Sequence, residues 1–73
     1  MAPGAHLLLQ TDPGRAGDVA EQVARLASVT EAMVTSGPYD VIALVDGSVD
    51  VALVLAQVKR TPGLARLCVC RSA

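Results

Sequence analysis

The stretch that decides the fold runs from Thr35 to Val45 and reads Thr-Ser-Gly-Pro-Tyr-Asp-Val-Ile-Ala-Leu-Val. It joins a turn signal to an unbroken apolar run. Glycine tolerates a positive φ and proline fixes φ near the value that a turn requires, so Gly37-Pro38 predicts the tip of a hairpin. The apolar run after it predicts a strand buried on both faces. Polar groups with no obvious structural task gather at this tip, which makes it the best candidate for a binding site.

Length and charge narrow the class of protein. A chain of 73 residues is one domain, and such a domain buries only about 60% of the surface that its unfolded chain exposes, so we expect self-association. The formal net charge is −1 and there is no basic run, which argues against direct nucleic-acid binding. No apolar stretch is long enough to span a membrane, and the N-terminus lacks the features of a signal peptide. We therefore expect a soluble, cytoplasmic protein.

Four further turn signals divide the rest of the chain: Pro3-Gly4, Pro13-Gly14, Asp46-Gly47-Ser48 and Pro62-Gly63. Between them the pattern predicts strands over Ala5–Thr11, Val29–Thr35, Tyr39–Val45 and Gly63–Arg71. Two amphipathic segments predict helices. Asp12 is the expected N-cap of the first helix, with Pro13 in its first turn, and Ser48 the expected N-cap of the second, with Asp50 in its first turn.

The order strand, helix, strand, strand, helix, strand predicts an α+β fold, the ferredoxin-like βαββαβ sandwich, with the first and third strands central. Both helices then cover one face of the sheet. The other face carries Leu8, Ile42 and Leu44, and an exposed apolar patch of that size usually marks an interface. We therefore expect two copies to pack sheet to sheet, as in a dimeric α/β barrel.

Three segments resemble the effector-binding domain, or RAM domain, of the Lrp/AsnC regulators: Gln10-Thr11-Asp12-Pro13-Gly14, the stretch from Val34 to Val45, and Thr61-Pro62-Gly63-Leu64. The most specific part is Thr-x-Gly-x-Tyr-Asp leading into the third strand. The resemblance implies a single RAM-like domain over residues 5–71, between tails at 1–4 and 72–73. Full-length members carry an N-terminal helix-turn-helix, whereas this chain starts directly at the first strand, so it resembles a stand-alone version.

The resemblance also implies what the domain binds. It implies a homodimer that assembles into an octamer or decamer, a small amino-acid-like effector, and full-length Lrp/AsnC regulators as candidate partners. The effector-binding candidates, carried over by position, are Thr35, Ser36, Gly37, Tyr39 and Asp40. Gly37 permits close approach of the backbone to an effector carboxylate, Asp40 can accept hydrogen bonds from an ammonium group, and Tyr39 offers a rigid wall. The alternative is a plain hairpin tip, in which Asp40 caps the turn and Tyr39 packs at a subunit contact.

A second group of reactive side chains is His6 with Cys68 and Cys70. If the first and last strands pair antiparallel, the three lie on one face of the sheet, as soft ligands of zinc or copper(I) would. The two cysteines lack the usual C-x₂₋₄-C spacing, however, and a disulfide across one intervening residue would be strained. We therefore expect reduced thiols that fill a subunit interface, and no metal or cofactor.

The sequence offers little support for catalysis. His6 is the sole histidine, no nucleophile elbow surrounds a serine, and the glycines do not form a phosphate-binding loop. The sequence therefore predicts a non-enzymatic module for effector binding and oligomerisation. Two alternatives stay open, a small dimeric α/β-barrel enzyme and a purely structural assembly module.

Overall fold

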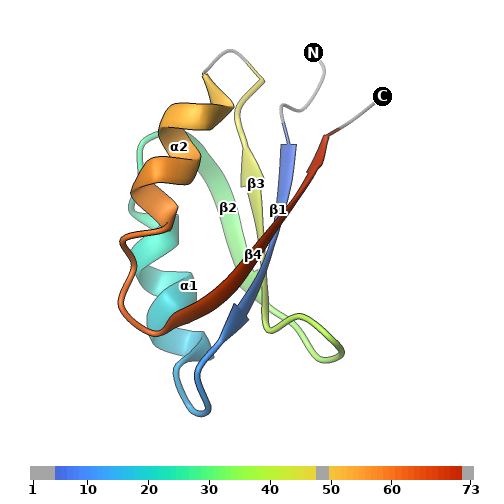
Figure 1. Ribbon diagram of the computed structural model, residues 1–73. Helices are drawn as coiled ribbons and strands as arrows, with labels where there is room; N and C mark the ends of the chain where they lie inside the picture. The colour runs from blue at the N-terminus through green and yellow to red at the C-terminus, as the bar shows by residue number, and fades with distance from the viewer. Residues whose placement is uncertain (1–4, 48–49, 72–73) are drawn as a thin grey trace.

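A computed structural model describes residues 5–47 and 50–71 of the chain. In chain order the elements are β1 (Ala5–Thr11), α1 (Ala16–Ala24), β2 (Val29–Val34), β3 (Val41–Val45), α2 (Val51–Val58) and β4 (Leu64–Arg71) (Figure 1). This order confirms the expected ferredoxin-like α+β fold. The two predicted tails, 1–4 and 72–73, lie outside the described residues.

The strands form one antiparallel sheet in the order β2-β3-β1-β4. The first and third strands are therefore central, as the sequence predicts. Both helices lie on the same side of the sheet (Figure 1). The side of the sheet that the helices do not cover is called the open face below.

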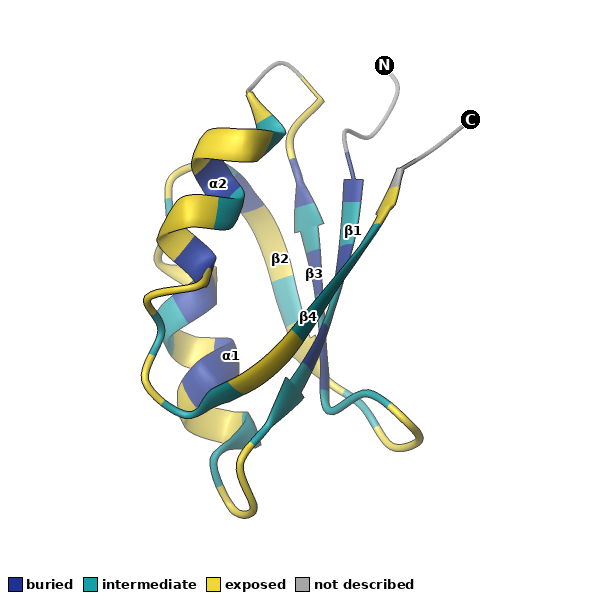
Figure 2. Ribbon diagram, in the orientation of Figure 1, coloured by how far each residue is buried: buried dark blue, intermediate teal, exposed yellow. Residues whose placement is uncertain are grey.

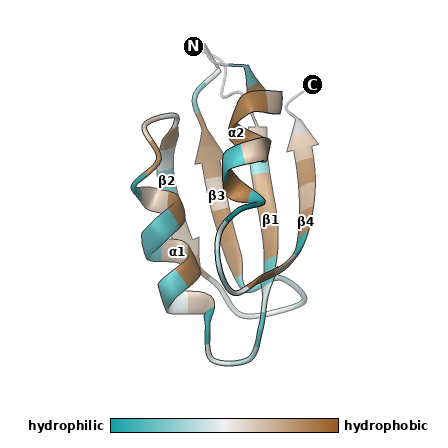
Figure 3. Cartoon of the chain, turned by 60° about the vertical axis from the view of Figure 1, so that its left-hand side comes forward, coloured by the Kyte–Doolittle hydropathy of each residue, from teal (hydrophilic) through white to brown (hydrophobic). Residues whose placement is uncertain are grey.

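The hydrophobic core lies between the helices and the sheet. Alternate residues of the central strands are buried there, because successive side chains of a strand point to opposite faces (Figure 2). Leu7 and Leu9 of β1 are 0% exposed and meet Val19 and Val23 of α1, which are also 0% exposed, in one cluster. Apolar residues run along β1 and β3 (Figure 3). None of the helices in the described part of the chain is long and apolar enough to cross a membrane.

Both predicted helix caps are wrong. The Asp12 carbonyl accepts a hydrogen bond from the Arg15 amide at 3.0 Å, and Gly14 has φ +79°. These values, with Pro13 at the second position, describe a type II turn before the helix, and the N-cap is Arg15. The Asp50 carboxylate accepts from the Ala52 amide at 2.9 Å and is the N-cap of α2. Ser48, the expected cap, lies outside the described residues.

An irregularity in β2 sets which of its side chains point toward the helices and which lie on the open face. Val29 pairs with Val45 but Glu31 pairs with Leu44, so Thr30 is the extra residue of a β-bulge. The bulge shifts the alternation by one residue. As a result Glu31 and Met33 share a face with Leu44 and Ile42, which are their cross-strand partners on the open face.

Candidate functional site

The loop between β2 and β3 is the most prominent feature near the open face. It lies at the end of the sheet opposite the one where β1 begins and β4 ends. It projects on the side of the sheet that faces away from the helices (Figure 1). Both strands that flank the loop are shorter than the sequence predicts, because β2 ends at Val34 and β3 starts at Val41. The loop therefore spans all five predicted effector-binding residues.

Asp40 ties this loop to the central strand β1. Its amide donates to the Leu9 carbonyl at 2.8 Å, and its Oδ2 accepts from the Thr11 amide at 2.8 Å and from the Thr11 hydroxyl at 3.3 Å. Hydrogen bonds that end on a charged group are stronger than those between neutral groups. Asp40 is thus a structural anchor of the loop through β1, whereas the plain hairpin interpretation expects its carboxylate to cap the turn.

Thr35 forms hydrogen bonds across the loop, to residues on its other side. Its amide donates to the Asp40 carbonyl at 2.8 Å and its hydroxyl donates to the Tyr39 carbonyl at 2.9 Å. Gly37 at the tip has φ +127°, a value that residues with a Cβ rarely adopt. Ser36 and Gly37 are exposed, whereas Tyr39 is half-buried. Hydrogen bonds within the loop and between the loop and β1 therefore fasten it, while its tip is open to solvent.

The tip still has polar groups to offer a ligand. Among the hydrogen bonds of the described residues, those to the Asp40 carboxylate all end on Oδ2, and none uses the amides of Ser36 or Gly37. A carboxylate oxygen can accept from an ammonium group, and backbone amides can donate to a carboxylate. The chemistry of the tip is compatible with a zwitterionic ligand, and the role of the five residues in binding stays a prediction.

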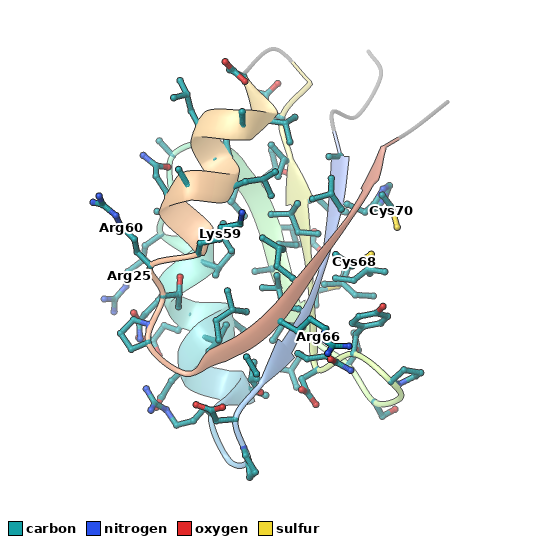
Figure 4. All side chains as sticks on the ribbon, in the orientation of Figure 1. Arg25, Lys59, Arg60, Arg66, Cys68 and Cys70 are labelled. Atoms are coloured by element: carbon teal, nitrogen blue, oxygen red, sulfur yellow. The ribbon has the colours of Figure 1, made fainter. Side chains whose placement is uncertain are left out.

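The effector-binding prediction omitted three residues beside the loop. Thr11 holds Asp40, and Gln10 donates from Nε2 to the Pro38 carbonyl at 2.8 Å. Arg66 is the cross-strand partner of Gln10, so it lies on the open face at the loop end of the sheet. Its side chain points away from the helices (Figure 4). The predicted antiparallel pairing of β1 with β4 was the signal that places Arg66 here.

The thiols lie where the pairing predicts. His6 pairs with Cys70 and Leu8 with Cys68, and both sulfur atoms lie on the open side of the sheet (Figure 4). Cys68 is half-buried, Cys70 is exposed, and both are free. Within residues 5–47 and 50–71, however, no three His, Cys, Asp or Glu side chains come together as metal ligands. The structure gives His6, Cys68 and Cys70 no support as a metal site within one copy.

A shallow hollow of about 300 Å³ lies on the outer side of α2. All of its lining residues belong to that one helix and the turn after it: Leu53, Ala56, Gln57 and Arg60. A ligand site normally draws walls from several elements that converge on the ligand. The hollow has no such walls, so the hairpin loop stays the better candidate.

Comparison with known proteins gives a fold but no sequence family. No protein-family model matches the sequence, and no curated protein matches it significantly. Solved structures do match. FFRP-DM1, of the Lrp/AsnC or FFRP family, superposes with a TM-score of 0.83 over 97% of this chain and 99% of that chain, at 23% identity. This chain has the fold of FFRP-DM1.

Two further structures share that fold. TTHA0845 from Thermus thermophilus superposes with a TM-score of 0.86 at 27% identity, over 97% of this chain and 92% of that one. The hypothetical protein PHS023 from Pyrococcus horikoshii superposes with a TM-score of 0.82 at 23% identity, over 97% of this chain and 89% of that one. The match to FFRP-DM1 supports the Lrp-like fold to which the sequence resemblance pointed.

Proposed function

We propose that this protein is a non-enzymatic module of the Lrp/AsnC type that self-associates and binds a small amino-acid-like effector at the loop between β2 and β3. The observation that carries the proposal is the loop itself. It is fixed to β1 through Asp40 while Ser36 and Gly37 at its tip stay exposed. A loop that is ordered before the ligand arrives loses less conformational entropy on binding. The fold shared with FFRP-DM1 supports the same interpretation.

In this proposal each end of the effector meets a different part of the loop. The carboxylate accepts from the amides of Ser36 and Gly37, the ammonium group donates to Asp40 Oδ1, and Tyr39 bounds the pocket. Thr35 holds the loop closed through its bond to the Tyr39 carbonyl. The open face supports self-association, since the strand pairing lines up Met33, Ile42, Leu8 and Cys68 side by side across it. The dimer would then assemble further into an octamer or decamer, with full-length Lrp/AsnC regulators as candidate partners.

Calorimetric titration of the protein with each of the twenty amino acids tests whether one of them is the effector. We expect at least one to bind, and we expect Asp40→Asn to lose that binding. Asparagine keeps an oxygen that can accept from the Thr11 amide but removes the negative charge that attracts an ammonium group. An unchanged circular dichroism spectrum for Asp40→Asn is the control for folding. If no amino acid binds to the unmodified protein, the proposal is wrong.

A purely structural assembly module is the second candidate. The observation that favours it is that both polar side chains already have structural partners: the Thr35 hydroxyl donates within the hairpin, and the Asp40 carboxylate accepts from Thr11 of β1. In that case the loop would stabilise contacts between copies and bind nothing. The same titration separates the two functions, because this module would associate normally and bind no amino acid.

A further inference from the structure

Arg66 is a cation beside the loop between β2 and β3 that the proposed function does not use. It is exposed, and its cross-strand partner is Gln10 of β1. Its guanidinium forms no ion pair and no hydrogen bond among the residues that the structure describes. Arg25, Lys59 and Arg60, in contrast, lie on the helix side of the sheet (Figure 4). Arg66 is therefore a positive charge that is available at the loop end of the open face.

Arg66, Gln10 and Asp40 lie in one line across the sheet. The Asp40 amide donates to the Leu9 carbonyl at 2.8 Å, which places Asp40 beside β1, next to Gln10. Gln10 pairs with Arg66 on its other side, and it donates from Nε2 to the Pro38 carbonyl at 2.8 Å. Neighbouring strands lie about 4.8 Å apart, so the backbones of Asp40 and Arg66 are about 10 Å apart. A small ligand bound at the loop is therefore within reach of the long arginine side chain.

The loop and Arg66 together offer one site for a positive group and two sites for negative groups. The protein hydrogen bonds to the Asp40 carboxylate in the described residues end on Oδ2, so Oδ1 can accept from an ammonium group. The amides of Ser36 and Gly37 can donate to one carboxylate, as in the proposed function. The Arg66 guanidinium can donate to a second carboxylate through two parallel hydrogen bonds. A ligand that satisfies all three sites has one ammonium group and two carboxylates.

We propose that the effector is a dicarboxylic amino acid, aspartate or glutamate, and that Arg66 binds its side-chain carboxylate. The inference rests on the proposed effector site and specifies the class of effector. Arg66 selects for the second negative charge, since an uncharged side chain would leave the guanidinium without a partner. A second copy on the open face would cover its apolar middle, whereas Arg66 lies on an edge strand at the end of that face, beside the loop.

Matched pairs of amino acids provide the main test. Glutamate and glutamine, like aspartate and asparagine, have nearly the same shape and differ in one charge. In calorimetric titrations we expect the acid of at least one pair to bind at least about tenfold more tightly than its amide, because a hydrogen bond between two charged groups is strong. Added salt should narrow the difference, since it screens charges near the surface.

Substitutions of Arg66 test whether this residue causes the preference. Arg66→Gln should lower the affinity for the acid to that for its amide and leave the affinity for the amide unchanged. Arg66→Lys keeps the charge but loses the bidentate geometry, so it should retain part of the preference. Arg60→Gln, in the turn after α2, removes the same charge on the helix side and is the matched control. It should keep the full preference. Circular dichroism checks that each variant is folded.

The outcomes separate this inference from the function on which it rests. If no amino acid binds to the unmodified protein, the proposed function fails and the dicarboxylic effector with it. If uncharged amino acids bind as tightly as aspartate and glutamate, the dicarboxylic effector is wrong while the effector site stands. If an acid is preferred and Arg66→Gln keeps that preference, another group recognises the second carboxylate and the role given to Arg66 is wrong.

Discussion

Replacing Asp40 by alanine should destabilise the fold even in the absence of any ligand. The change removes the acceptor of the Thr11 amide, at 2.8 Å, and of the Thr11 hydroxyl, at 3.3 Å. A hydrogen bond to a charged group contributes about 1.5–3 kcal/mol. Thr11 and Asp40 are only half-buried, so water can replace part of the lost interaction. We expect the free energy of unfolding to fall by about 1–3 kcal/mol.

Asparagine at the same position is the matched control. It keeps an acceptor oxygen for Thr11, so it should retain most of the stability. In a domain of this size, 1 kcal/mol corresponds to about 4–8 °C in Tm. Asp40→Ala should therefore melt at least about 4 °C below the unmodified protein, with Asp40→Asn between the two.

Thermal melts followed by circular dichroism at 222 nm measure both variants. All samples need the same protein concentration, because the Tm of a self-associating protein rises with concentration. Equal Tm values for Asp40→Ala and the unmodified protein would show that the loop anchor contributes nothing to stability. A drop for asparagine as large as that for alanine would show that the charge, and not the hydrogen bond to Thr11, stabilises the loop.

Substitutions at four further positions test other parts of the fold, by urea unfolding followed by circular dichroism. Gly63→Ala should cost about 1–2 kcal/mol, because Gly63 has φ +90° and an added Cβ would lie 3.1 Å from Arg15 Cβ; an unchanged midpoint would contradict this. Leu7→Ala should cost about 2–5 kcal/mol, since Leu7 is 0% exposed, whereas Leu8→Ala on the open face should cost less and weaken dimerisation in sedimentation; the reverse order would mean that the two faces are misassigned. Asp50→Ala should cost about 1 kcal/mol through the lost N-cap, and Asp50→Asn should restore it.

Periodicity and turn signals were enough to predict the large-scale organisation. Alternation along β1 separates Leu7 and Leu9 from Leu8, and the structure places the first two in the core. The antiparallel pairing of β1 with β4 puts His6 opposite Cys70, as expected. These features follow from the period of a strand, which is a local property of the sequence.

Features that depend on distant residues were not predictable in the same way. Asp40 is held by Thr11, which lies 29 residues away in the chain, and only the folded sheet brings the two together. The bulge at Thr30 shifts the alternation of β2, so its buried side could not be assigned from the pattern. The cap of α1 failed because Pro13-Gly14 satisfies a type II turn, which competes with helix initiation at Asp12.

The bulge at Thr30 also limits how this chain can aggregate. An edge strand presents unpaired backbone groups, and a sheet with two regular edges can add copies head to tail into a fibril. The extra residue breaks the spacing of those groups along β2, so this edge is a poor template for another strand. The other edge strand, β4, is irregular as well, since Arg66 pairs with Gln10 but Leu64 pairs with Thr11, which leaves Ala65 as an extra residue. With an interruption in both edge strands, neither edge of the sheet is a regular template on which further copies could add.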